Sequence, residues 1–334
     1  MKRVMGLFKN LPLWGAIFGT FLTLGLGLSS IGQDRLTAQD NNKSTELRVG
    51  DIEIAIEPET RIQRDNGRWL LKEISKAKRG STVVVPQGYY FLLDMPVRKS
   101  ITLVGQGDVI FQASRPVRKG LIVPGIGVNL RIENVTFRGA RSADRNGAGI
   151  RHEGRDLTIV DCIFEGNENG VLSTGAEKGN VEVHNSTFLN SGHGDGQSHG
   201  IYLSSGNSLL INHARFIGTK IGHHVKSLAR ITTVQNSYFD DAGAGTSYTV
   251  DVTRGGDAIV KDNFIIQRDS AQNATIINYD DDRGGKPGAL TIEGNRIVNF
   301  HPFGRFYRNG TDIDPVTQNN TISNDGSGRL KLDG

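Results

Sequence analysis

One aromatic position returns at nearly constant intervals through most of this 334-residue chain. Six segments end in phenylalanine, as VIF, NVTF, DCIF, NSTF, HARF and NSYF, and successive phenylalanines stand 23 to 28 residues apart. These residues are Phe111, Phe137, Phe164, Phe188, Phe216 and Phe239. The series continues less strictly as DNFI at Ile265 and GNRI at Ile297. A repeat of this length decides the fold before local propensity does, because one repeat cannot bury its own apolar face.

A second short apolar segment recurs within each repeat, with its central residues 21 to 30 positions apart. These central residues are Ile150, Val171, Ile201, Val225, Val250 and Ile277. Short strands at this period predict a parallel β-helix, in which stacked coils share one core. A β-propeller is disfavoured because its blades need about 40 residues or more. We therefore expect an all-β, single-domain parallel β-helix.

Turn-forming residues flank the repeated phenylalanine. Asparagine or aspartate stands three positions before it in four repeats, and ladders of such residues would satisfy hydrogen bonds inside the coils. These residues are Asn134, Asp161, Asn185 and Asn236. Glycine or asparagine stands two positions after the phenylalanine, at Gly139, Gly166, Asn190 and Gly218. We expect a turn with positive φ at these four positions.

The segment before the repeats predicts a short helix. Trp69, Leu70, Ile74 and Ala77 fall on one helical face, and Asp65 or Asn66 is the expected N-cap. Strands are also expected within residues 47–63, where LRVGDIEIAI alternates weakly.

Composition narrows the class of protein. The chain has 43 glycines and 9 prolines, which suits many short strands and tight turns. Its net charge is +4, and no long basic run lies outside the extreme N-terminus, so nucleic acid is not an expected partner. Cys162 is the single cysteine, which excludes an internal disulfide and indicates a buried, inert thiol.

The N-terminus has the features of a targeting segment. Lys2, Arg3 and Lys9 precede an apolar run that ends near Ile31. Residues 1–32 are therefore predicted to be a secretory signal peptide, with an uncleaved membrane anchor as the alternative. Residues 33–46 form a polar linker, 47–300 the β-helix and 301–334 a C-terminal cap or tail. We expect a monomer that is secreted or located in the periplasm or cell envelope, with membrane contact only through an uncleaved N-terminus.

Residues 60–300 resemble the right-handed parallel β-helix superfamily typified by pectate lyases. The likeness lies in LLKEISKAKRGSTVVVPQGYYF followed by KSITLVGQG, and in the NxTF-type repeats. The series GQSHGIY, GHHVKS and YTVD is similar to that of bacterial β-helix repeat proteins. The resemblance implies a short N-terminal capping helix and a function on polysaccharides, often acidic ones. It does not imply catalysis, because the same scaffold also serves binding and structural proteins.

Polar residues follow the second strand of the repeats. Residues alternate in direction along a strand, so the residue after each inward-facing one should face outward. This predicts an outward column of Tyr202, Lys226, Asp251 and Asn278, with Arg151 and Leu172 in earlier repeats. His224 is expected to face outward as well, and His199 and His223 stand at the strand entrance. Six of the eight histidines lie between His184 and His224.

This column contains groups that a uronate lyase needs. Such an enzyme needs a cation for the carboxylate, a base for the C5 proton and an acid for the leaving oxygen. Lys226 and Arg254 are the candidate cations, His224 or His199 the base, and Tyr202 the acid. The catalytic prediction is His199, Tyr202, His224, Lys226 and Asp251, and the substrate-binding prediction is Arg151, Arg254, Asn278 and Asp280.

Two alternatives to a lyase remain open at this stage. An epimerase could use the same groups and return the proton to the opposite face. In a non-catalytic glycan-binding or envelope structural protein, Lys226 and Asp251 would be an ordinary surface ion pair. A groove overhung by long turns would favour an enzyme, and residues 190–199 are a candidate wall.

No cofactor is expected. Asp280–Asp282 and Asp240–Asp241 are rich in oxygen ligands, which leaves calcium as the alternative. His223 and His224 are adjacent and should face opposite ways, which disfavours a zinc pair. His193 lies in a Gly-His-Gly that is similar to one in polygalacturonases, but the other motifs of that branch are missing.

Overall fold

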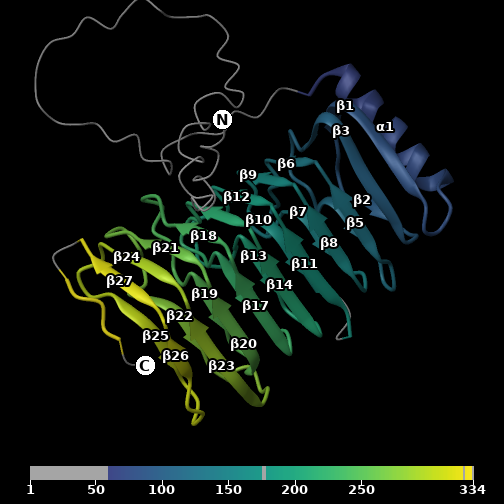
Figure 1. Ribbon diagram of the computed structural model, residues 1–334. Helices are drawn as coiled ribbons and strands as arrows, with labels where there is room; N and C mark the ends of the chain where they lie inside the picture. Colours follow the sequence, from purple (N-terminus) through teal and green to yellow (C-terminus); the bar gives the residue numbers. More distant parts are fainter. Residues whose placement is uncertain (1–58, 175–177, 326–327, 333–334) are drawn as a thin grey trace, which may run out of the picture. The chain divides into compact units, whose positions relative to one another are not determined.

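The computed structural model describes residues 59–174, 178–325 and 328–332, and these form a parallel β-helix preceded by one helix (Figure 1). All strand pairs are parallel and join one coil to the next. Each full coil contributes two consecutive strands to an eighteen-stranded sheet, called sheet A, and one strand to a nine-stranded sheet, called sheet B. The predicted fold class is confirmed.

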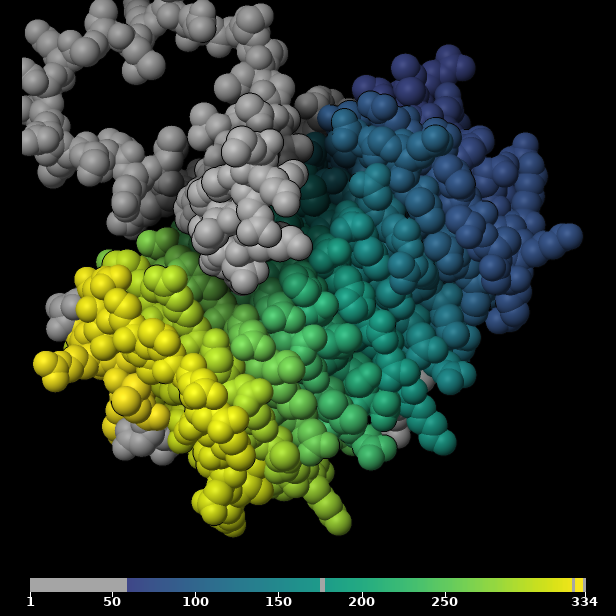
Figure 2. All heavy atoms as spheres, viewed as in Figure 1, coloured from purple at the N-terminus to yellow at the C-terminus, as the bar shows by residue number. Residues whose placement is uncertain are grey.

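Sheet A is formed by β1 (Thr82–Phe91), β3 (Ile101–Gln112), β5 (Leu130–Glu133), β6 (Thr136–Arg138), β8 (Leu157–Val160), β9 (Ile163–Glu165), β11 (Asn180–His184), β12 (Thr187–Leu189), β14 (Ser208–Asn212), β15 (Arg215–Ile217), β17 (Ile231–Gln235), β18 (Tyr238–Asp240), β20 (Gly256–Lys261), β21 (Phe264–Gln267), β23 (Pro287–Glu293), β24 (Arg296–Asn299), β26 (Val316–Gln318) and β27 (Thr321–Asn324). Sheet B is formed by β2 (Met95–Val97), β4 (Gly120–Pro124), β7 (Ala148–His152), β10 (Asn169–Ser173), β13 (Ile201–Leu203), β16 (Val225–Ser227), β19 (Val250–Val252), β22 (Thr275–Tyr279) and β25 (Arg305–Asn309). Consecutive coils lie side by side in sequence order, as the colour gradient of Figure 2 shows.

The repeated phenylalanines from Phe137 to Phe239 form one stack through the core, and Phe111 meets its end edge-on. Phe164 and Phe188 lie 4.6 Å apart between ring centroids with an interplanar angle of 1°. Phe188 and Phe216 repeat this arrangement at 4.6 Å and 3°. These distances are close to the 4.7–4.9 Å separation of hydrogen-bonded strands, because each ring follows its own strand. The repeat seen in the sequence is therefore the register of the β-helix.

Left-handed backbone conformations bend the coils that contain Phe137, Phe164, Phe188 and Phe216 at two places. The turn expected after each phenylalanine is confirmed, with φ between 51° and 72° at Gly139, Gly166, Asn190 and Gly218. The Asn or Asp three positions before the phenylalanine also has positive φ, for example 53° at Asn134. Short polar side chains tolerate this conformation better than others do. Asn134 and its counterparts therefore mark the bend between the two sheet A strands of a coil.

The N-terminal helix α1 spans Arg61–Lys76 and packs against β1. Its N-cap is Thr60, whose hydroxyl accepts a hydrogen bond from the Gln63 backbone N–H while the Gln63 side chain accepts one from the Thr60 N–H. The expected N-cap at Asp65 or Asn66 is therefore wrong, because the capping box starts the helix earlier. Gly67 is needed for close packing, since a Cβ there would lie 2.2 Å from the Phe91 carbonyl oxygen.

Regular coils continue beyond residue 300, where the sequence led us to expect only a cap. β25 pairs with β22, β26 with β23, and β27 with β24. Cys162 is buried, and burial raises the pKa of its thiol to about 12, as an inert core cysteine requires. The predicted targeting segment and the polar linker lie outside the described residues. So do residues 47–58 of the strands expected within 47–63, and α1 begins at Arg61, so the end of that range is helical. Among the described residues, no helix has the length and apolar character needed to cross a membrane.

Candidate functional site

The predicted column exists on sheet B, but two of its members, Asp251 and Asn278, are buried, at 1% and 2% exposed. Tyr202 pairs in register with Lys226, Lys226 with Asp251, and Asp251 with Asn278. Their strand neighbours Ile201, Val225, Val250 and Ile277 are buried in the core, as alternation requires. The column continues from Asn278 to Arg308, which the sequence analysis missed because the chain after Phe300 carries no repeated phenylalanine. At the other end it includes Leu172 and Arg151.

A continuous polar network, formed by Lys226, Asp251, Asn278, Asp280 and Arg308, joins these coils. The Lys226 ammonium lies 3.2 Å from Oδ2 of Asp251. Nδ2 of Asn278 donates to Asp251 Oδ1 at 2.8 Å and to Asp280 Oδ2 at 2.8 Å. Nη1 of Arg308 donates to Asn278 Oδ1 at 2.8 Å and to Asp280 at 3.1 Å. Two cations and two carboxylates are thus paired along one face of sheet B.

Tyr202 lies at the N-terminal end of this network. The Lys226 Nζ atom lies 5.7 Å from the centroid of the Tyr202 ring. The His199 imidazole meets the same ring edge-on, at 5.3 Å between centroids. The phenol of Tyr202 on β13, the ammonium of Lys226 on β16 and the imidazole of His199, just before β13, are therefore adjacent.

Beside the column, side chains accept backbone hydrogen bonds from coil to coil. Asn169 Oδ1 accepts from the His199 N–H at 2.9 Å, His199 Nδ1 from the His223 N–H at 3.0 Å, and His223 Nδ1 from the Tyr248 N–H at 3.2 Å. The His199 and His223 rings stack at 4.8 Å. We call Asn169, His199, His223 and Tyr248 the side-chain ladder.

The ladder fixes the protonation of both imidazoles. An Nδ1 that accepts a hydrogen bond leaves the proton of a neutral ring on Nε2. Burial lowers the pKa of His199 well below its usual value, and it lowers the pKa of His223 to about 3. His199 and His223 are thus neutral donors through Nε2, and Nε2 of His223 lies 3.3 Å from Asp251 Oδ2. A role as general base, predicted for His199, does not fit this arrangement.

His224 does not belong to the outward column, so its expected orientation is wrong. Its ring is fully buried, 6.1 Å from Phe216 and 5.8 Å from Phe239. Its Nδ1 lies 2.8 Å from Thr219 Oγ1, and its Nε2 lies 3.4 Å from Asp241. Strand alternation fails here because the chain enters β16 from a bend, and two successive residues face the interior.

A sequence signal for this exception was present. The position before the inward residue is glycine in three coils, at Gly149, Gly170 and Gly200. A Cβ at Gly170 would lie 2.5 Å from Phe188, and one at Gly200 would lie 3.0 Å from Phe216. His224 occupies the same position one coil later. The glycines therefore show that this position faces the phenylalanine stack.

The Asp251 carboxylate is also buried, with its side chain 2% exposed. Burial raises the pKa of Asp251, while Lys226 and the hydrogen bond from Asn278 oppose that rise. The Lys226 side chain, at 16% exposed, is the more accessible partner of the pair. The buried Asp251 carboxylate thus orients the more exposed Lys226 ammonium.

Two predicted binding residues lie away from the polar network. Arg254 is in the turn after β19 and packs against Gly285. Arg151 is two coils from Tyr202, with Nε 3.9 Å from Glu153. The predicted substrate-binding residues Asn278 and Asp280 are both part of the network. The structure therefore brings together Tyr202, Lys226, Asp251, Asn278, Asp280 and His199, and it adds His223 and Arg308.

Within the described ranges, no three His, Cys, Asp or Glu side chains are arranged to hold a metal ion. Asp240, from one of the two acidic segments, forms two 2.8 Å contacts with Arg268. Asp280, from the other, contacts Asn278 and Arg308. The expectation of no cofactor, with calcium as the alternative, stays a prediction.

The candidate wall at residues 190–199 is attached to the neighbouring coils. The His193 N–H donates to Ser198 Oγ at 2.7 Å, and His193 Nδ1 lies 3.3 Å from the buried Glu168 carboxylate. Nη1 of Arg145 donates to Oδ2 of Asp195 at 3.3 Å, so this loop also contacts the loop before β7. These contacts hold the loop beside the start of β13, the strand of Tyr202.

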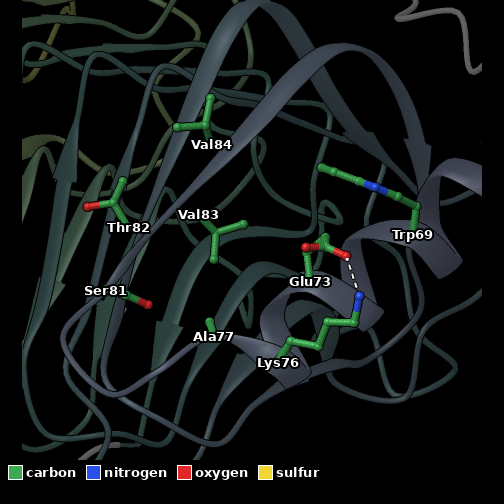
Figure 3. A pocket seen from close by; sticks show the side chains of 8 residues that line it. All are labelled: Trp69, Glu73, Lys76, Ala77, Ser81, Thr82, Val83 and Val84. Atoms are coloured by element: carbon green, nitrogen blue, oxygen red, sulfur yellow. Dashed lines mark hydrogen bonds and ion pairs between the residues drawn. The ribbon is translucent and has the colours of Figure 1, made fainter.

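Two hollows lie elsewhere on the surface. One, of about 310 Å³, lies between α1 and β1 (Figure 3), where Glu73 and Lys76 form an ion pair across one turn of the helix. Its remaining lining residues are Trp69, Ala77, Ser81, Thr82, Val83 and Val84. The other, of about 330 Å³, is lined by Asp94, Pro96, Arg118, Lys119 and Val123. Neither hollow includes the polar network.

No protein-family model and no curated protein matches the sequence. Among solved structures, a mutant of the PL6 family alginate lyase AlyGC is similar over 76% of this chain and 38% of its own, with 14% identity and a TM-score of 0.47. The PL6 family alginate lyase AlyGC itself is similar over the same shares, with 12% identity and a TM-score of 0.40. The chain thus spans 38% of the length of these structures.

Proposed function

We propose that this protein is an exported enzyme that acts on an acidic polysaccharide, as a lyase or an epimerase of its uronate residues. The observation that carries the proposal is the contact of Tyr202 with both Lys226 and His199 on the outer face of sheet B. These three residues supply a phenol, a cation and a neutral hydrogen-bond donor, and the last two both contact the Tyr202 ring. Together they match the needs of chemistry at the carbon next to a carboxylate.

Lys226 binds the uronate carboxylate in this proposal. Its ammonium is held by Asp251 and by the Tyr202 ring, so it is oriented before substrate arrives. The charge of Lys226 stabilises the negative charge that grows on the carboxylate when the C5 proton leaves. The Nε2–H of His199 is a second donor to the same oxygens.

Proton transfer then falls to Tyr202. His199 and His223 use Nδ1 for backbone hydrogen bonds, and His224 is in the core, so none of these three imidazoles is available as the base. In a lyase, the C5 proton is removed, the C4 oxygen leaves with a proton, and a C4–C5 double bond forms. One tyrosine can take the first proton as phenolate and deliver it to the leaving oxygen. In an epimerase, Tyr202 keeps the C5 proton, and water delivers another proton to the opposite face of C5.

A non-catalytic glycan-binding protein is the second candidate. It is favoured by the pairing of each network cation with a carboxylate, Lys226 with Asp251 and Arg308 with Asp280. It is also favoured by the position of both hollows outside the network. A face of this kind can hold a sugar chain without reacting with it.

The deciding experiment follows both reactions on the same substrates. The purified protein is incubated with a panel of uronate polysaccharides in deuterated water. Ultraviolet absorbance reports the double bond of a lyase, and NMR reports deuterium at C5 for an epimerase. We expect one of these signals in the wild type and its loss in Tyr202→Phe and Lys226→Ala, but not in Lys261→Ala on sheet A. Neither signal across the panel, with binding retained, would leave the glycan-binding candidate in its place.

A further inference from the structure

The second hollow lies at the N-terminal end of the same outer column. Pro96 of β2 pairs with Val123 of β4, and both line the hollow. Val123 directly follows Ile122, which pairs with Ile150, so the next residue of the column is Arg151. Arg151 pairs with Leu172, and Leu172 pairs with Tyr202. One row of side chains therefore connects the hollow to the proposed reactive groups.

The residues of the hollow suit a sugar ring that carries an acid group. Pro96 and Val123 provide an apolar floor for the C–H face of a ring. Arg118 and Lys119 supply positive charge at the rim, and Arg151 adds a third cation on the next strand. Charge and apolar area thus occur together at this end of the column.

Hydrogen bonds fix the backbone at the rim of the hollow. The Asp94 carboxylate accepts backbone N–H groups of Arg118, Lys119 and Gly120 at 3.0, 2.6 and 3.2 Å. These hydrogen bonds fix the segment that carries the two cations. The Lys119 ammonium lies 2.6 Å from Glu153, which holds it next to Arg151. Nε of Arg151 is buried and has no hydrogen-bond partner among the described residues.

The distance between the hollow and Lys226 fits a sugar polymer and not a single sugar. Val123 and Lys226 are four strands apart, which at 4.7–4.9 Å per strand is about 19 Å. One strand spacing is close to the length of one sugar residue in an extended 1,4-linked chain. A chain that runs along the β-helix axis, with one sugar at the hollow and one at Lys226, would therefore need about five residues to cover these four spacings.

We propose that the hollow of Pro96, Val123, Arg118 and Lys119 is a distal subsite for an acidic oligosaccharide that lies along sheet B. The inference rests on the proposed function, because it assumes that an acidic glycan reaches Tyr202 and Lys226. It adds the direction of the bound chain and a dependence of binding on chain length. The occupant is one uronate residue of the same chain, with its carboxylate at Lys119 and Arg151.

The test measures the affinity of the full protein for size-defined oligouronates, from dimers to octamers, by calorimetry. In the wild type we expect affinity to rise at least tenfold once the chain is long enough to reach the hollow. Val123→Glu places bulk and negative charge on the floor, and it should remove this rise while leaving the affinity for dimers and trimers unchanged. Lys119→Gln is the milder variant and should reduce the rise. Lys261→Gln on sheet A is the matched control and should change neither.

The outcomes separate the two proposals. If the wild type binds no oligouronate of any length, the proposed function fails and the subsite fails with it. If short oligouronates bind but affinity does not rise with length, or if the rise survives Val123→Glu and Lys119→Gln, only the subsite is overturned. Circular dichroism of each variant checks that the fold is intact.

Discussion

Replacing Lys226 by methionine should destabilise the protein more than replacing its partner Asp251 by asparagine. The asymmetry follows from burial, because the Asp251 side chain is 2% exposed while that of Lys226 is 16% exposed. Loss of the cation leaves a buried carboxylate with only Asn278 and His223 beside it, whereas loss of the carboxylate leaves an ammonium that can turn toward water. Removing one partner of a buried ion pair costs about 3–5 kcal/mol, and we expect Lys226→Met at the lower end of that range. Asp251→Asn should cost about 1.5 kcal/mol, the lower end for a lost hydrogen bond to a charged group.

The assay is urea unfolding of both single variants and the double variant, followed by circular dichroism. The double variant should cost less than the sum of the singles, with a coupling of at least about 1 kcal/mol for groups in direct contact. Equal costs for the two single variants, or a loss of under about 0.5 kcal/mol for Lys226→Met, would contradict the burial argument. Arg131→Met on the exposed part of sheet A is the control and should fall within about 0.5 kcal/mol of the wild type.

The same pair predicts a dependence on pH. The pKa of Asp251 is raised by burial, so the folded protein binds this proton more tightly than the unfolded chain does. Its contribution to stability is present below the pKa of an unfolded Asp and is lost as the pH rises through the raised pKa. Lys226→Met removes a charge that holds this pKa down, and so it should steepen the loss of stability with rising pH. Asp251→Asn should flatten it, which unfolding curves between pH 4 and pH 8 would test.

Three further predictions concern the scaffold. Phe188→Leu removes stacking on Phe164 and Phe216. It should lower the free energy of unfolding in urea by about 1–2 kcal/mol. The volume-conserving Ile265→Leu in the same column is the comparison and should lower it by under about 1.5 kcal/mol. Gly200→Ala places a Cβ 2.5 Å from the His224 carbonyl oxygen, and it should cost about 1–3 kcal/mol, seen as a lower melting temperature. Thr60→Ala breaks the capping box of α1 and should cost about 1 kcal/mol by the same measurement, whereas Thr60→Ser should cost little.

The parts of the site that the sequence could predict are those set by the repeat. Aligning Ile201, Val225, Val250 and Ile277 gave the pairing of Tyr202, Lys226, Asp251 and Asn278, because strand register stacks like residues on like. Alternation then gave the correct face for each of them. The repeat could not give Arg308, because the last coil carries Phe306 and Tyr307 without the spacing of the earlier ones.

The parts that could not be predicted depend on backbone direction at the bends. Strict alternation placed His224 outside, but the chain before β16 is not a strand, and the residue there faces the phenylalanine stack. The tautomers of His199 and His223 depend on which backbone N–H points at each ring. Neither feature is contained in residue type or spacing.

Two of the clustered histidines, His199 and His223, therefore have a structural role as well as the proposed chemical one. In the side-chain ladder, the Asn169 side chain accepts the backbone N–H of His199 in the next coil. In the same way, the His199 and His223 rings each accept a backbone N–H of the coil that follows. An acceptor in this place satisfies a buried donor, so histidine and asparagine are interchangeable for folding. They are not interchangeable for chemistry, because the longer imidazole carries its one N–H on Nε2, beside the Tyr202 ring, where the shorter asparagine amide does not reach. Replacing His199 by asparagine should keep the fold, which thermal unfolding would confirm, while removing the donor beside Tyr202 and lowering activity or glycan affinity. Loss of the fold in this variant would show that the stacked rings, and not the hydrogen bonds, hold these coils together.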